Sequence, residues 1–148
     1  MLEQRVLDYI DAHAQEAREL LITLAQIPSP SNHEEKRAEF CRKWLEDQGA
    51  RGVFVDEALN VVYPIGVTHD NPVVVFMAHT DVVFPDMEPL PLRIEDGKIF
   101  CPGVGDDTAN LACLMMIAKY LTETGEADRL DKAAGAGTCP RGLVLGCN

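Results

Sequence analysis

Six consecutive apolar residues, at positions 73–78, limit the possible folds of this chain more than any other segment. A run of this length and composition is typical of a strand that is buried on both faces of a sheet. Downstream, residues 108–122 carry apolar side chains at helical spacing, and residues 142–147 form a second strand-like run. The order strand, helix, strand predicts a β-α-β unit in which the two strands are parallel.

Other segments extend this pattern on both sides of the unit. Apolar residues at three- and four-residue steps predict a helix over residues 2–26, which Pro28 and Pro30 end. Ser31 and Glu34 have the spacing of a Ser-x-x-Glu capping box, so we expect a second helix to start there and to end at Gly49. The remaining expected elements are short strands at 53–55 and 61–65, a hairpin at 92–100 that is closed by Asp-Gly, and a Gly/Ala/Pro-rich connector at 125–140. Together these elements predict an α/β fold, a three-layer α/β/α sandwich with a mixed, mainly parallel sheet.

The charge balance restricts the kind of partner. The chain has 148 residues, about one domain, with 13 Lys and Arg against 24 Asp and Glu, a formal net charge of −11. Such a surface repels nucleic acids and anionic membranes and favours cations, including metal ions. No apolar stretch approaches the roughly 18 residues that a membrane-spanning helix requires.

The cysteines indicate a reducing compartment. The five cysteines are an odd number and contain no Cys-x-x-Cys pair, and charged residues recur near the N-terminus, unlike in a secretory signal. We therefore expect reduced thiols and a cytoplasmic protein.

Chemistry-bearing residues follow the first buried strand directly. His79 and Asp81 are two positions apart, so an extended backbone points both side chains to the same side. Imidazole suits zinc, and a neighbouring carboxylate can accept the other ring N–H and fix the tautomer. A satisfied histidine at a capped strand end remains the alternative for this pair alone.

A second cluster lies just before the third helix. Asp106 and Asp107 follow Gly103-Val104-Gly105, and a helix N-terminus favours negative charge. One aspartate is readily explained as a helix cap, the second less readily. A phosphate-binding loop is disfavoured because the segment lacks Gly-Lys-Ser/Thr and its two carboxylates would repel a phosphate.

Both clusters resemble those of one enzyme family. Residues 77–83, Met-Ala-His-Thr-Asp-Val-Val, and residues 96–107, Asp-Gly-Lys-Ile-Phe-Cys-Pro-Gly-Val-Gly-Asp-Asp, are similar to the two metal motifs of the zinc-dependent exopeptidases and amidohydrolases. That family contains carboxypeptidase G, peptidase T, aminoacylase and succinyl-diaminopimelate desuccinylase. Residues 27–31, Ile-Pro-Ser-Pro-Ser, also resemble its usual opening.

The resemblance implies a role for each motif residue. His79 would bind one zinc ion, Asp106 would bridge two, and Asp81 would act in catalysis by orienting His79. A cis peptide would join Asp106 to Asp107, which would support the site rather than bind metal. The implied reaction is hydrolysis of a peptide or an N-acyl amino acid by metal-activated water.

Two departures from the family pattern matter. Thr108 and Ala109 stand where the family usually has Lys and Gly. The family's Glu-Glu pair, its distal acidic and histidine ligands and its lid or dimerisation domain do not occur within residues 1–148. We therefore expect this chain to be the N-terminal portion of a catalytic domain, with partial zinc occupancy or none and no activity alone.

Two other functions stay open on the sequence. The chain is alternatively a non-catalytic binding or regulatory fragment that retains the fold. A weaker alternative is a phosphohydrolase that uses the aspartates and prefers magnesium. In any of these cases an unpaired sheet edge and an uncovered apolar face favour a homo-oligomer.

Overall fold

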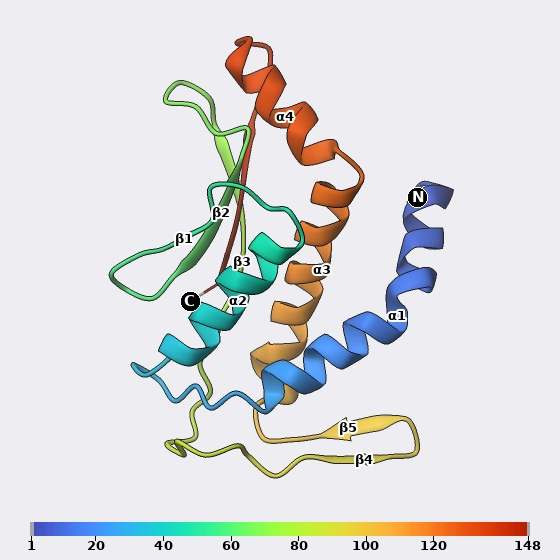
Figure 1. Cartoon of the computed structure of the whole chain (residues 1–148), viewed down its shortest axis with the longest axis vertical. Coiled ribbons are helices and arrows are strands. Elements are labelled where there is room, and N and C mark those ends of the chain that lie inside the picture. The colour runs from blue at the N-terminus through green and yellow to red at the C-terminus, as the bar shows by residue number, and fades with distance from the viewer. Residues whose placement is uncertain (1, 148) are drawn as a thin grey trace.

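The structure is a computed structural model, and it describes residues 2–147 (Figure 1). Within this range two helices are followed by five strands, a short π-helical turn at Val104–Thr108, two further helices and a last strand. The helices are α1 (Gln4–Ala25), α2 (Glu35–Asp47), α3 (Ala109–Glu123) and α4 (Glu126–Gly135). The strands are β1 (Phe54–Val55), β2 (Val61–Ile65), β3 (Val73–Ala78), β4 (Arg93–Glu95), β5 (Lys98–Phe100) and β6 (Gly142–Cys147).

The main sheet has the strand order β1-β2-β6-β3. Strand β6 is parallel to β3, with Val73 opposite Gly142 and Ala78 opposite Cys147, and helix α3 connects the two strands in sequence. The predicted β-α-β unit is therefore confirmed. The pairings β1–β2 and β2–β6 are antiparallel, so the sheet is mixed, as expected. The expectation that it is mainly parallel is wrong for residues 2–147, because β3–β6 is the one parallel pairing among them.

One face of this sheet and all four helices share a single core. Alternate residues of β2 point into it, and every helix contributes at least one buried side chain. Representative members are Val61, Tyr63, Ile65, Leu24, Cys41, Leu111, Ala127 and Leu145. The α/β class is thus confirmed, and of the three layers expected, residues 2–147 form two: the sheet and the helical layer on one of its faces (Figure 1).

The other face of the sheet is not covered by the described residues. Val73, Val75 and Met77 of β3 are 41 %, 56 % and 71 % exposed, although the run is entirely apolar. The expectation that residues 73–78 are buried on both faces is wrong for this chain. The apolar run correctly predicts a strand, but burial of its second face requires a layer that residues 2–147 do not supply.

Two local expectations are also wrong. The carboxylate of Glu34 accepts the backbone N–H of Asn32 (2.7 Å), and the Ser31 hydroxyl donates to Asp81, so no Ser-x-x-Glu box caps α2. The expected connector at 125–140 contains helix α4, which buries Ala127 against the core. The signal for α4 was its acidic first turn and a basic last turn, which the Gly and Ala content of the segment obscured.

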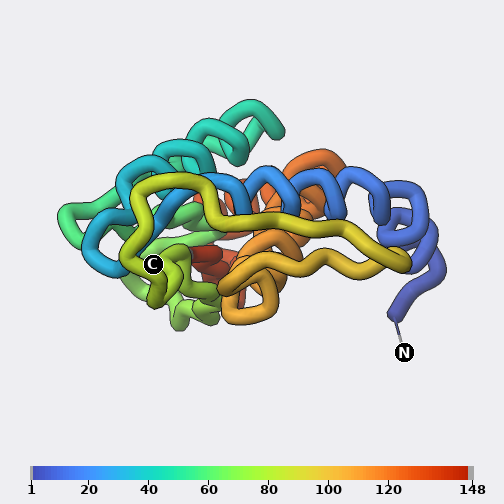
Figure 2. The backbone as a smooth tube through the Cα atoms, turned by 90° about the horizontal axis from the view of Figure 1, so that it is seen from below, coloured from blue at the N-terminus to red at the C-terminus, as the bar shows by residue number. Residues whose placement is uncertain are grey.

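The β4–β5 hairpin leaves the main sheet and lies along α1 (Figure 2). Its turn residues Asp96 and Gly97 have φ of 50° and 75°, which fits the predicted Asp-Gly turn. The amide of Gln26 donates to the Leu90 carbonyl (3.0 Å), which fixes the entry to the hairpin near the end of α1. The hairpin thereby returns the chain to Gly103, beside the carboxyl end of β3.

No helix within residues 2–147 is long and apolar enough to cross a membrane.

Candidate metal centre

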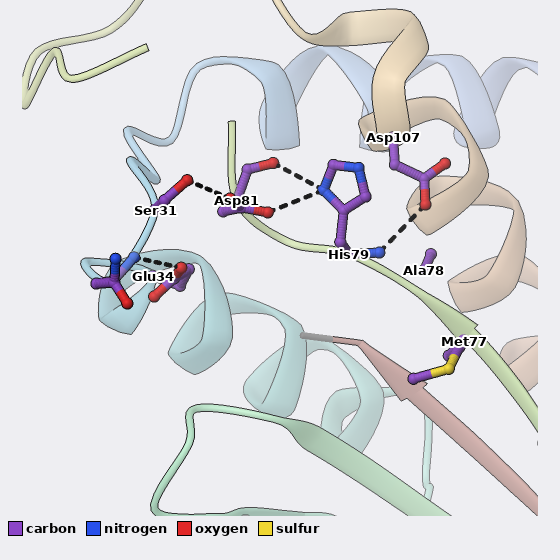
Figure 3. Close-up of a pocket in the computed structure, with 8 residues that line it drawn as sticks. Ser31, Glu34, Met77, Ala78, His79, Asp81 and Asp107 are labelled. Carbon is purple, nitrogen blue, oxygen red and sulfur yellow. Dashed lines mark hydrogen bonds and ion pairs between the residues drawn. The ribbon is translucent and has the colours of Figure 1, made fainter. Parts of the chain in front are cut away.

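His79 is the first residue after β3, and its ring is held on one side by Asp81 (Figure 3). The ring Nδ1 lies 3.0 Å from the Asp81 carboxylate Oδ1 and 3.1 Å from the Asp81 carbonyl oxygen. Both neighbours are acceptors, so Nδ1 carries the proton and donates it to Asp81. The lone pair of Nε2 is then free in the neutral ring, which is the form that binds a metal.

Asp106 faces this free nitrogen. Its Oδ1 lies 3.4 Å from His79 Nε2, although the two residues are far apart in sequence. The backbone brings them together through Gly103, whose φ of 75° turns the chain, and through a cis peptide bond between Asp106 and Asp107. The cis bond that the family resemblance implied is therefore present. The side chain of Asp106 is 97 % exposed, so it is open to a ligand from solution.

The facing nitrogen and oxygen can hold a cation between them. A carboxylate and a neutral imidazole nitrogen are both acceptors, so the contact becomes attractive when a proton or a metal ion joins them. Ligands about 2.0–2.2 Å from a tetrahedral zinc are roughly 3.4 Å apart, which matches the separation of His79 and Asp106. The two residues therefore fit a zinc ion. Among residues 2–147, however, no group of three or more His, Cys, Asp or Glu side chains is placed to hold a metal.

The surrounding acids act on the His79 proton as well. Burial lowers the pKa of His79, but the hydrogen bond to Asp106 and the negative charges of Asp81 and Asp107 outweigh burial. The net result is a pKa above the ordinary value for histidine. The site thus attracts positive charge in the form of a proton.

Asp107 has a different role from Asp106. Its Oδ2 accepts the backbone N–H of His79 (3.1 Å), and its Oδ1 accepts the side-chain amide of Asn110. Both carboxylate oxygens are therefore engaged with the protein itself. This supports the implied distinction in which Asp107 positions the site and Asp106 is available to a metal.

Two hollows flank His79 and Asp81. One, of about 570 Å³, also contacts Ser31, Glu34 and Asp107 (Figure 3). The other, of about 410 Å³, is also lined by Val83, Phe84, Gly103 and Asp106. His79 and Asp81 thus line both hollows, and their side chains are 43 % and 27 % exposed.

Sequence reasoning missed two residues that contact this edge. The Ser31 hydroxyl donates to Asp81 Oδ2, so Asp81 is bonded on both oxygens. Arg37 is 2 % exposed and donates to the carbonyl of Thr80, between His79 and Asp81. In the sequence, Ser31 fits a capping box and ends the 27–31 segment that resembles the family's opening, but neither pattern links it to Asp81. Arg37 gives no signal because a single arginine on an amphipathic helix usually faces solvent.

The fold and this edge define an α/β protein with a candidate metal centre at the carboxyl end of a parallel strand. Residues 75–131 match the model of the peptidase family M20/M25/M40. The matched segment contains His79, Asp81 and both residues of the cis peptide. The resemblance to a family of peptidases is therefore confirmed.

Solved structures share the fold over most of this chain. The chain aligns to aminopeptidase PepT from Bacillus cereus with a TM-score of 0.63 and 20 % identity, covering 90 % of this chain and 35 % of that one. For the di-peptidase Dug1p from Saccharomyces cerevisiae the TM-score is 0.62 at 22 % identity, covering 97 % and 33 %. For human carnosine dipeptidase 1 it is 0.64 at 19 %, covering 98 % and 34 %. The chain thus spans about a third of the length of these proteins.

Proposed function

We propose that His79, Asp81 and Asp106 are part of the dinuclear zinc centre of a peptidase or amidohydrolase. The observation that carries this proposal is the 3.4 Å separation of His79 Nε2 and Asp106 Oδ1, with Nδ1 already engaged by Asp81. The match to a peptidase family supports a peptide or N-acyl amino acid as the substrate.

Each residue has a distinct task in this centre. His79 would hold zinc through Nε2, and Asp106 would hold it through a carboxylate able to reach a second ion. Asp81 would keep the Nδ1 proton in place and make the imidazole a stronger ligand. In such centres the bound metal supplies a water of lowered pKa and polarises the carbonyl that is attacked.

The described residues provide only part of such a centre. Two ligands make a weak zinc site, and a four-coordinate site needs further groups. We therefore propose that residues 1–148 correspond to the N-terminal part of a catalytic domain, and we expect the chain alone to hydrolyse no peptide. Zinc binding without activity fits this proposal and a binding or regulatory role equally, so a bound partner, rather than zinc, distinguishes the two.

Cobalt titration tests the metal site directly, because Co²⁺ occupies zinc sites and absorbs visible light. We expect the 148-residue chain to bind Co²⁺ weakly and zinc to displace it. Asp106→Asn is expected to weaken binding at least about tenfold. Asp96→Asn, in the β4–β5 turn, is the matched control and should leave binding unchanged.

Failure of the chain to bind Co²⁺, or equal binding by Asp106→Asn, would contradict the metal assignment. Preference for Mg²⁺ over zinc together with cleavage of a phosphate ester would favour the phosphohydrolase alternative.

We also infer that a second copy of the chain pairs at strand β3. This strand is at the edge of the sheet, and its outer face is apolar and exposed. Unpaired edges of this kind invite strand pairing between chains. Sedimentation of a clean monomer at tens of micromolar protein would contradict the inference.

The cytoplasmic location stays a prediction.

A further inference from the structure

Arg37 is a charged residue placed inside the protein. It belongs to helix α2, is 2 % exposed, and makes no ion pair with any carboxylate of residues 2–147. Burying a guanidinium without a counter-ion is costly, and burial lowers the pKa of Arg37. A residue that is retained in such a place has to make several good hydrogen bonds.

The hydrogen bonds of Arg37 connect three separate segments. Its Nη2 donates to the carbonyls of Leu24 (2.9 Å) and Ile27 (3.0 Å), at the end of α1 and in the loop that follows. Its Nη1 donates to the Thr80 carbonyl (2.7 Å) and, at 3.4 Å, to the Thr108 hydroxyl. Arginine can do this because its planar group carries five donors, whereas lysine has a single ammonium.

Two of these partners belong to the candidate metal centre. Thr80 is completely buried and lies between His79 and Asp81. Thr108 is 1 % exposed, lies two residues after Asp106, and donates its hydroxyl to the Gly103 carbonyl (3.0 Å). One side chain therefore bonds to the motif that carries His79 and to the residue directly after the motif that carries Asp106.

The third partner segment reaches the same edge. Beyond Ile27, the carbonyl of Ser29 accepts the N–H of Val82 (2.8 Å), and Ser31 donates to Asp81. The loop that Arg37 fixes thus contacts the residues that follow His79. The position of the His79 ring relative to Asp106 depends on these three segments together.

We infer that Arg37 is a positioning residue of the metal centre: it sets the separation of His79 and Asp106 by bonding to Thr80 and Thr108. The expected effect of Arg37 on metal binding rests on the proposed function. The expected effect of Arg37 on the position of the His79 ring does not depend on any metal.

The test compares Arg37→Met with a matched loss of another buried cation, Lys119→Met. Lys119 is 8 % exposed and pairs with Glu16 and Glu123, so it joins α1 to α3 without contacting the site. Both variants should be less stable in urea than the wild type. Only Arg37→Met should change the site itself.

Two readouts separate positioning from stability. Long-range ¹H–¹⁵N NMR reports which ring nitrogen of neutral His79 carries the proton. We expect the Nδ1–H form in the wild type and in Lys119→Met, and a mixture of tautomers in Arg37→Met. We further expect Co²⁺ binding to weaken at least about tenfold in Arg37→Met and to stay within about twofold in Lys119→Met.

Arg37→Lys keeps the positive charge and replaces Arg37→Met in both measurements if Arg37→Met does not fold. Because one ammonium cannot hold Thr80, Thr108 and the 24–27 carbonyls at once, its tautomer and affinity should still change. A folded Arg37 variant with the wild-type tautomer and wild-type Co²⁺ affinity would overturn the inference. If the wild type binds no Co²⁺ but Arg37→Met still alters the His79 tautomer, the proposed function fails and the positioning role stands.

Discussion

The two halves of the candidate centre are built in opposite ways. His79 is followed by Thr80, which is completely buried, and Asp81, which is bonded to Ser31 and to the ring. Asp106, by contrast, has a side chain that is 97 % exposed and is placed by the backbone of the loop around it. One candidate ligand is therefore set by buried polar contacts and the other by chain geometry.

This difference separates stability from metal binding. Substitutions beneath His79 remove buried contacts and should change folding and binding together. Substitution of Asp106 itself should change binding with little effect on folding. Gly103 lies where the two halves touch, so it should have the largest effect.

Replacing Gly103 with alanine is expected to destabilise the protein by about 2–5 kcal/mol. Its φ of 75° is unfavourable for an L-residue by about 1–2 kcal/mol, and overpacking adds roughly 1–3 kcal/mol. The overpacking arises because a Cβ would lie 2.5 Å from Val82 Cγ1, next to the His79 segment. Urea unfolding measures the difference.

Gly105→Ala is the matched control in the same loop. A Cβ there meets no atom within 4 Å, and its φ is not in the left-handed range. We expect a change of less than about 0.5 kcal/mol. Equal effects at the two glycines would show that contact between the halves does not limit stability.

Much of this arrangement could be predicted from the sequence. Strands β2, β3 and β6 were expected at their observed bounds, because apolar runs between turn residues specify strands locally. The rule that strand ends collect functional groups, together with the family resemblance, predicted that His79, Asp81 and Asp106 would come together. The burial of β3 could not be predicted, because it depends on what covers the second face.

The buried polar contacts beneath His79 were not predictable in the same way. The groups that accept hydrogen bonds from Arg37 are mostly main-chain carbonyls, those of Leu24, Ile27 and Thr80. Every residue has a main-chain carbonyl, so no pattern of side chains in the sequence indicates which carbonyls accept a hydrogen bond from Arg37. The same holds for Ser31, whose spacing to Glu34 suggested a helix cap and whose real partner is Asp81.

Two buried threonines near the candidate centre differ in the hydrogen bonds of their hydroxyl groups. Thr108→Val should cost about 1–2 kcal/mol, because the Thr108 hydroxyl donates to Gly103 and accepts from Arg37. The Thr80 hydroxyl has no hydrogen-bond partner among the described residues, so Thr80→Val should be neutral or stabilise by up to about 1 kcal/mol. Calorimetric melting of both variants measures the two changes in stability. A larger loss at Thr80 than at Thr108 would mean that its hydroxyl is bonded in solution.

Two serines give a smaller effect of the same kind. Ser31→Ala removes the hydrogen bond to Asp81 and should destabilise by about 0.5–1.5 kcal/mol. Ser29→Ala is the control, because its hydroxyl is buried without a hydrogen-bond partner among residues 2–147. If urea unfolding gives the two serines equal losses, the Ser31–Asp81 bond contributes nothing to the stability of the His79 half.

The smallest change in folding is expected at the residue with the clearest part in metal binding. Asp106→Asn should alter the free energy of unfolding in EDTA by less than about 0.5 kcal/mol, because the side chain is 97 % exposed. In excess zinc the wild type should gain stability, by about 2.7 kcal/mol where free zinc is a hundredfold above its Kd. Asp106→Asn should lose most of that gain, since it removes one of two ligands. Denaturation curves with EDTA and with zinc measure both quantities. An equal zinc-dependent gain in the variant would place the metal elsewhere on this acidic chain and would remove Asp106 from the centre.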